Sequence, residues 1–183
     1  MAAIPRTPGV INRYKRLSGI VQDYFSYFEE LANGYPWEVT IGYLFTYVEL
    51  AQNMTIYCGV VKLHRVESRL ARRAVEAYHM TRPGFRDTYR VVFGQPIPQK
   101  LIAKIKEAEG VRDKIVHGKS VSDQNMRKAV IDILDYAEAL NEEVYDFAKF
   151  RPFGPLRGFK GRAAPLDVAT SRWVLKGMGF DLS

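Results

Sequence analysis

The sequence has little cysteine, no uninterrupted hydrophobic run of membrane-spanning length and no internal repeat. Cys58 is the only cysteine, and a lone cysteine cannot form an internal disulfide, which argues against a secreted scaffold held by disulfides. The most apolar stretch, residues 39–63, is interrupted by Glu49, Gln52 and Asn53, so we expect a buried helix there and no membrane partner. The N-terminus has no apolar run behind a basic start, so we expect no signal peptide and a cytoplasmic protein.

Several familiar enzyme signals are also missing. The histidines, His64, His79 and His117, have no mutual spacing suited to a metal, and no cysteine cluster exists. Residues 118–120 (Gly-Lys-Ser) look like the end of a phosphate-binding loop, but Asp113 stands where that loop requires a glycine, and the preceding residues read as a helix. A Gly-x-Ser-x-Gly motif is absent as well. We therefore expect neither a metal nor another cofactor.

Charge is plentiful and unevenly distributed over the 183 residues, whose formal net charge is +7. Three segments are basic, with net charges of +4 for residues 1–20, +5 for 62–90 and +4 for 151–183. Residues 21–61 and 120–148 each carry −5. A basic face of this size would attract a polyanion through phosphate contacts. Solvated helix faces with intramolecular pairing explain the same pattern equally well.

Apolar residues recur at helical spacing along most of the chain. Residues 64–80 continue the pattern, either as an extension of the helix before them or as a separate helix. Residues 81–96, with two prolines and two glycines, predict a loop. Within the long apolar helix, Gly42 and Gly59 are expected to allow close helix contacts. The predicted helices span residues 10–32, 36–63, 98–117, 122–150 and, as a short element, 168–176.

These elements predict an all-α fold. We expect an antiparallel bundle of four to five helices over residues 1–150, because an apolar stripe on each helix must be buried against another element. Residues 151–183 are basic and begin with a segment rich in proline, glycine and arginine. They predict a C-terminal extension that is first extended and then packs on the body.

The sequence Arg112-Asp113-Lys114-Ile115-Val116-His117-Gly118 closes the helix predicted at 98–117. Gly118 suits the left-handed position after a helix end. A helix C-terminus favours a charged imidazole, and arginine offers a fixed fork for phosphate oxygens. Five residues turn an ideal helix by about 140°, so Arg112 and His117 do not share a face. They converge only if the helix end deviates or a second copy of the site faces the first. Capping of the helix end is the structural alternative.

This motif resembles the signature of HEPN domains, which is an arginine, a polar residue, a few further residues and then a histidine. The resemblance covers roughly residues 10–150, but only the seven-residue motif is specific. It implies a homodimer whose two motifs line a shared cleft, and in many members a metal-independent ribonuclease activity. His117 would then transfer protons, Arg112 would clamp the phosphate and Asp113 would occupy the polar position. Attack by the ribose 2′-hydroxyl would give a cyclic phosphate end.

Many members of this family are toxins or defence effectors, so an antitoxin or another regulatory protein is an expected partner. Our leading hypothesis is a hydrolase of this type acting on RNA. The expected RNA contacts are Lys114 within the motif, Lys119 just after it, and Arg69, Arg72 and Arg73 at helical spacing together with Arg65. One alternative is a non-catalytic HEPN-like module that binds RNA, a nucleotide or a protein. Another is a helical structural protein whose charges keep it soluble.

Overall fold

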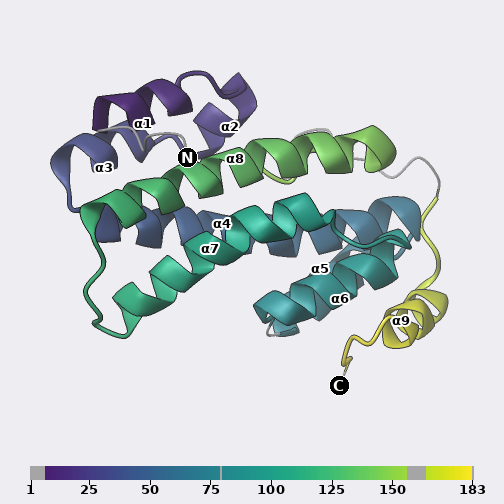
Figure 1. The fold of residues 1–183 in the computed structure, drawn as a ribbon. Coiled ribbons are helices and arrows are strands. Elements are labelled where there is room, and N and C mark those ends of the chain that lie inside the picture. Colours follow the sequence, from purple (N-terminus) through teal and green to yellow (C-terminus); the bar gives the residue numbers. More distant parts are fainter. Residues whose placement is uncertain (1–6, 79, 156–163, 183) are drawn as a thin grey trace. The chain divides into compact units, whose positions relative to one another are not determined.

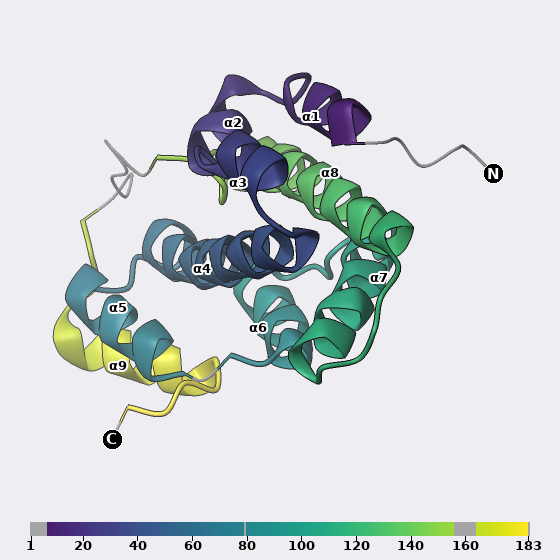
Figure 2. The same cartoon turned by 90° about the vertical axis from the view of Figure 1, so that its left-hand side faces the viewer.

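The regular secondary structure in the described part of the chain is entirely helical. A computed structural model describes residues 7–78, 80–155 and 164–182, and within them it contains nine helices and no strand. This confirms the all-α prediction, although the number of helices exceeds the four to five expected. The helices, labelled in Figure 1 and turned in Figure 2, are α1 Thr7–Tyr14, α2 Gly19–Tyr24, α3 Phe28–Gly34, α4 Trp37–Leu63, α5 Ser68–Ala77, α6 Arg82–Phe93, α7 Gln99–Val116, α8 Asp123–Ala148 and α9 Val168–Gly177.

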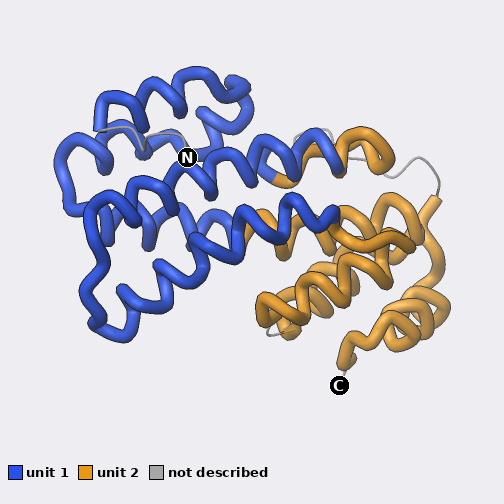
Figure 3. Tube along the Cα trace, viewed as in Figure 1, with its two compact units in different colours: residues 1–49, 98–143, 153–155 blue, residues 50–97, 144–152, 156–183 orange. Residues whose placement is uncertain are grey.

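The helices form two compact units, coloured in Figure 3. Unit 1 contains α1 to α3, the first part of α4, α7 and most of α8, together with residues 153–155. Unit 2 contains the remainder of α4, then α5 and α6, the end of α8 and α9. Residues of the expected C-terminal extension therefore enter both units. Neither unit is made from one continuous stretch of chain.

In unit 1, the region predicted as one helix over residues 10–32 is three short helices, so that prediction was wrong. Distant and local side chains satisfy the interrupted backbone. The Ser18 backbone N–H donates to both carboxylate oxygens of Glu138 at 3.2 Å. The Tyr14 hydroxyl donates to the carbonyl of Gln22 at 2.7 Å and to that of Phe25 at 3.1 Å. Because these bonds replace helical ones, a continuous apolar period does not require a continuous helix.

Helix α4 agrees with the long helix predicted at 36–63, and the question of its continuation is resolved. The chain leaves the helix after Leu63, and Arg65 adopts a left-handed conformation with φ of 58°. A separate helix, α5, then begins at Ser68, and the Glu67 carboxylate accepts from the backbone N–H groups of Arg69 and Leu70. Arg65 is thus no part of the helical row expected with Arg69, Arg72 and Arg73.

The loop predicted over residues 81–96 was wrong, because most of it is α6. Pro83 lies in the first turn, where a missing backbone N–H costs no helical hydrogen bond. Thr81 caps the helix by accepting from the Gly84 N–H, and Gly94 ends it with φ of 70°. Both prolines and glycines therefore mark the ends of the helix. The sequence signal was a threonine cap followed by proline, with Phe85 and Tyr89 on one buried face.

Helices α7, α8 and α9 confirm the elements predicted at 98–117, 122–150 and 168–176. Figure 2 shows α9 lying beside α5 in unit 2. The two elements are joined through the buried Ser171 hydroxyl, which accepts from the Glu67 N–H at 2.9 Å. Next to it, the Leu166 N–H donates to the Arg65 carbonyl at 2.8 Å. Residues 151–155 and 164–167 are non-helical, as predicted, whereas 156–163 lie outside the described residues.

In unit 1, the segment after α8 is fixed by a pair of buried hydrogen bonds. The Asn141 side chain donates to the Phe153 carbonyl at 2.9 Å and accepts from the Phe153 N–H at 2.7 Å. The Phe153 ring is fully buried, with its centroid 5.3 Å from that of Tyr24 and 5.7 Å from that of Phe25. The Asn141 amide therefore satisfies both backbone polar groups of Phe153, whose aromatic ring is buried in the core.

Replacing Asn141 with leucine is expected to lower the free energy of unfolding by about 2 kcal/mol, because it leaves two buried backbone groups of Phe153 without partners. Thermal unfolding followed by circular dichroism would measure the change. Asn125, exposed near the start of the same helix, provides the matched control, and Asn125→Leu should change stability little. Equal stabilities of the two variants would contradict the role of this hydrogen-bond pair.

Cys58 lies in the core of unit 2, as expected for a lone cysteine in an apolar stretch. Burial raises the pKa of its thiol to about 12. Near pH 8, roughly one such thiol in ten thousand is ionised, against about a quarter for a free thiol with a pKa near 8.5. We expect iodoacetamide to leave Cys58 unmodified in the native protein and to label it fully in denaturant, as read by intact mass. Rapid labelling of the native protein would show that the thiol is accessible.

Candidate functional site

The Arg112–Gly118 motif ends helix α7, and Gly118 has the left-handed conformation predicted for a residue after a helix end. Gly118 has φ of 66°, and its N–H donates to the Ile115 carbonyl at 3.0 Å. The Lys119 N–H reaches back to the Lys114 carbonyl at 2.8 Å. These two bonds form a Schellman motif, which satisfies carbonyls that the helix end would otherwise leave unpaired. The predicted left-handed position of Gly118 is thereby confirmed, and the helix stops at Val116 with His117 as its C-cap.

Arg112 is held on the side of α7 by residues of α4 in the same unit. Its Nη2 lies 3.2 Å from Glu49 Oε1, and its guanidinium carbon lies 5.8 Å from the centroid of the Phe45 ring. About a third of the Arg112 side chain is exposed (32%). The ion pair and the cation–π contact restrict the rotamers of a flexible side chain, while part of the guanidinium remains accessible.

Asp113 also contacts the guanidinium, with 3.7 Å between its Oδ1 and Arg112 Nη1. The polar position of the motif thus lies beside the arginine of the motif. Glu49 is a partner that the motif itself did not reveal. Its signal was indirect, since Glu49 is one of few polar residues in an otherwise apolar helix.

His117 is exposed, and only its backbone is engaged. Its N–H donates to the Asp113 carbonyl at 3.0 Å, and its φ and ψ of −88° and 15° already depart from α-helical values. The imidazole makes no hydrogen bond or ion pair with any residue that the structure describes. Because the backbone is helical from Arg112 to Val116, the five-residue interval places Arg112 and His117 on different sides of α7. One chain does not bring them together.

The backbone hydrogen bond from Lys119 to Lys114 brings these two residues together at the end of α7. A Schellman motif commonly places an apolar contact between these two positions. Here both are exposed lysines, and neither ammonium has an ion pair within the described residues. Val116 between them is 65% exposed. The end of α7 thus presents two cations, an imidazole and an uncovered apolar side chain.

The other expected RNA contacts lie elsewhere. Arg69, Arg72 and Arg73 are exposed on α5 in unit 2, where they line a pocket with a volume of about 600 Å³. Arg65, outside that helix, donates from Nε to the Ala164 carbonyl at 2.8 Å. The predicted RNA contacts therefore form two sets, one on each unit.

No protein-family model, curated protein or solved structure matches this chain. The resemblance to HEPN domains accordingly depends on the Arg112–Gly118 motif and its position at the end of α7. Among the described residues, no three His, Cys, Asp or Glu side chains are grouped so as to hold a metal ion; His79 lies outside that set. None of the described helices is both long and apolar enough to cross a bilayer.

Proposed function

We propose that this chain is a metal-independent endoribonuclease of HEPN type that acts as a homodimer. The observation that carries the proposal is the exposed imidazole of His117 at the closed end of α7, one and a half turns after an arginine that Glu49 and Asp113 hold in place. A toxin or defence role in the cytoplasm, with an antitoxin or other regulatory protein as partner, is what the same resemblance implies.

The residue types suit cleavage by an internal nucleophile. The ribose 2′-hydroxyl attacks the adjacent phosphorus and gives its proton to a base, while the 5′-oxygen leaves and receives a proton. The products are a 2′,3′-cyclic phosphate and a 5′-hydroxyl. His117 transfers protons in this scheme, and Arg112 stabilises the charge that develops on the phosphoryl oxygens. Lys114 and Lys119 hold the neighbouring phosphates.

A second copy supplies what one chain lacks. Arg112 and His117 diverge on a single helix, and one imidazole cannot act on both sides of the phosphorus at once. A two-fold axis beside the end of α7 would set two imidazoles and two guanidinium groups around one cleft. The exposed Val116 gives such an interface an apolar contact.

One observation favours a different function. Arg112 already has two carboxylate neighbours, and no hydrogen bond orients the His117 ring within the described residues. An arginine that is neutralised in this way, beside an unoriented imidazole, suits a non-catalytic HEPN-like module that binds RNA, a nucleotide or a protein. In that case the motif serves recognition alone.

RNA cleavage in EDTA tests the proposal directly. The wild-type protein should cut a single-stranded RNA pool in the presence of the chelator and leave cyclic phosphate ends. RNA with 2′-O-methyl groups should remain intact, because the nucleophile is blocked. Salt-dependent RNA binding with no cleavage would support the non-catalytic module and contradict the ribonuclease. Binding that does not depend on salt would show that nucleic acid is not the partner.

A further inference from the structure

The pocket in unit 2 is surrounded mainly by the first part of α5. It has a volume of about 600 Å³, within the range of sites for small ligands. Arg69, Arg72 and Arg73 line one part of it, and Tyr57 of α4 and Val168 of α9 contribute apolar surface. Because residues three and four apart lie on neighbouring positions of a helix, the three arginines fall within an arc of about 100°.

Two arginines of this pocket, Arg69 and Arg73, have no carboxylate within ion-pair distance among the described residues. Arg13 and Arg112 have carboxylate partners, Asp135 and Glu49. The side chains of Arg69 and Arg73 make no hydrogen bond or ion pair with described residues. The Arg72 guanidinium carbon lies 5.7 Å from the centroid of the Tyr57 ring, a stacking contact that leaves its N–H donors available.

One carboxylate, that of Glu67, also lines the pocket, but it is already engaged. It accepts from the backbone N–H of Arg69 at 2.9 Å and from that of Leu70 at 2.8 Å. These bonds, the one from Arg69 first, hold the pKa of Glu67 below its usual range. Glu67 thus stays ionised and occupies the donors at the start of α5. A ligand must therefore bind through the guanidinium groups.

The charge of the pocket selects the ligand. Three arginines and one glutamate leave a net charge of +2 among the lining residues. A phosphate monoester carries about −1.5 to −2 at neutral pH, whereas a phosphodiester carries about −1. Guanidinium groups bind phosphate oxygens in pairs, so three of them match the terminal oxygens of a monoester better than the two free oxygens of a backbone phosphate.

We propose that the pocket binds a phosphate monoester attached to a nucleoside, with the phosphate held by Arg69, Arg72 and Arg73 and the nucleoside beside Tyr57 and Val168. The ligand is either a free nucleotide or the phosphorylated end of an RNA strand. The pocket belongs to unit 2, whereas the Arg112–His117 motif belongs to unit 1. The inference holds whether or not the chain cleaves RNA.

Calorimetric titration of the full chain at about 0.15 M salt separates the two sources. AMP should bind, with inorganic phosphate weaker and adenosine weaker still. A 2′-O-methyl RNA, which resists cleavage, is titrated with a 5′-phosphate and with a 5′-hydroxyl. Preference for the phosphorylated strand over AMP identifies an RNA end, and the reverse identifies a free nucleotide. No binding of AMP and no preference for the 5′-phosphate would overturn the proposal.

Variants locate the site. Arg69→Ala and Arg73→Ala should each weaken binding about ten- to a hundredfold, the usual effect of a lost charged hydrogen bond. Tyr57→Leu should weaken AMP more than inorganic phosphate, because the ring lies beside the nucleoside and also contacts Arg72. Arg90→Ala removes the same charge from α6, outside the pocket, and should bind like the wild type. If Arg90→Ala weakens binding as much as Arg69→Ala, binding is due to general electrostatic attraction and the proposed site is wrong. His117→Ala should bind normally, which separates this proposal from the ribonuclease.

Discussion

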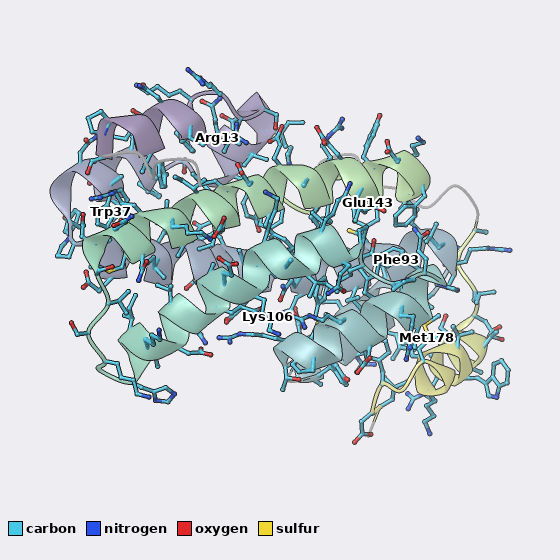
Figure 4. All side chains as sticks on the ribbon, viewed as in Figure 1. Arg13, Trp37, Phe93, Lys106, Glu143 and Met178 are labelled. Carbon is cyan, nitrogen blue, oxygen red and sulfur yellow. The ribbon has the colours of Figure 1, made fainter. Side chains whose placement is uncertain are left out.

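His117→Ala is expected to reduce RNA cleavage in EDTA by a factor of about 10²–10⁴, the usual contribution of a positioned proton-transfer group. The side chain is exposed and makes no hydrogen bond or ion pair with described residues. Its removal should therefore leave the thermal midpoint unchanged. Initial rates on a quenched fluorescent RNA, measured beside thermal unfolding, separate a catalytic loss from a folding defect. Lys106→Ala, which removes an exposed cation from the same helix (labelled in Figure 4), is the matched control and should retain most of the activity.

Arg112 provides a second measure of the same site. Arg112→Ala should lower cleavage about 10²–10³-fold through loss of charge stabilisation. Arg112→Lys keeps the charge but not the fork, so it should recover only part of that loss. Equal activity of the lysine variant and the wild type would show that geometry at Arg112 does not matter.

Mixed dimers test the shared cleft. If both copies contribute to one site, combining the His117→Ala and Arg112→Ala chains leaves one imidazole and one guanidinium in each cleft. The mixture should then be more active than His117→Ala alone, whose cleft has no imidazole. Activity of His117→Ala equal to that of the wild type would refute the enzyme, whatever the oligomeric state.

Gly59→Ala is expected to lower the free energy of unfolding by about 3 kcal/mol, at the upper end of the usual cost of overpacking. A Cβ at Gly59 would lie 2.5 Å from Val92 Cγ1 and 2.7 Å from Phe93 Cζ, so side chains of α6 must move. The Phe93 ring, labelled in Figure 4, packs on Phe147 with 5.4 Å between centroids and on Tyr89 with 4.5 Å, which limits that movement. Chemical denaturation would measure the loss.

Gly42 in the same helix is the matched control. No atom of the described residues lies within 4 Å of a Cβ at Gly42, so its predicted close contact was wrong while that of Gly59 is confirmed. Gly42→Ala should raise stability by up to about 1 kcal/mol, because alanine has the higher helix propensity. Adding Val92→Ala to Gly59→Ala should restore part of the loss. Similar effects of the two glycine substitutions would show that backbone propensity, and not the contact with α6, decides stability at Gly59.

Local patterns predicted the parts of the fold that local interactions determine. The start of α4 and the ends of α7 and α9 follow from apolar period and capping residues, and Gly118 adopts the left-handed conformation expected of it. The breaks at 15–18 and 25–27 depend on hydrogen bonds to distant groups such as the carboxylate of Glu138, which accepts from the Ser18 N–H 120 positions away. No local pattern specifies such a partner.

The candidate site also has features that local sequence predicts and features that depend on distant residues. The residue types of the motif and the end of its helix could be predicted, but the Glu49 carboxylate that holds Arg112 is 63 positions away. On α5, helical spacing grouped Arg69, Arg72 and Arg73 correctly. The pocket beside them needs Tyr57 and Val168, which only tertiary packing brings to α5.

The order of segments in the two units has a consequence for synthesis of the protein. Asn141 in unit 1 bonds to Phe153, and α5 in unit 2 packs on α9, so each unit depends on a segment that is synthesised after most of its other residues. While the ribosome is still elongating, the buried face of α5 and the Phe153 pocket lack their partners. Uncovered apolar surface on a nascent chain favours aggregation and chaperone binding. If translation stalled before residue 153, both units would therefore lack part of their core, and neither would be complete.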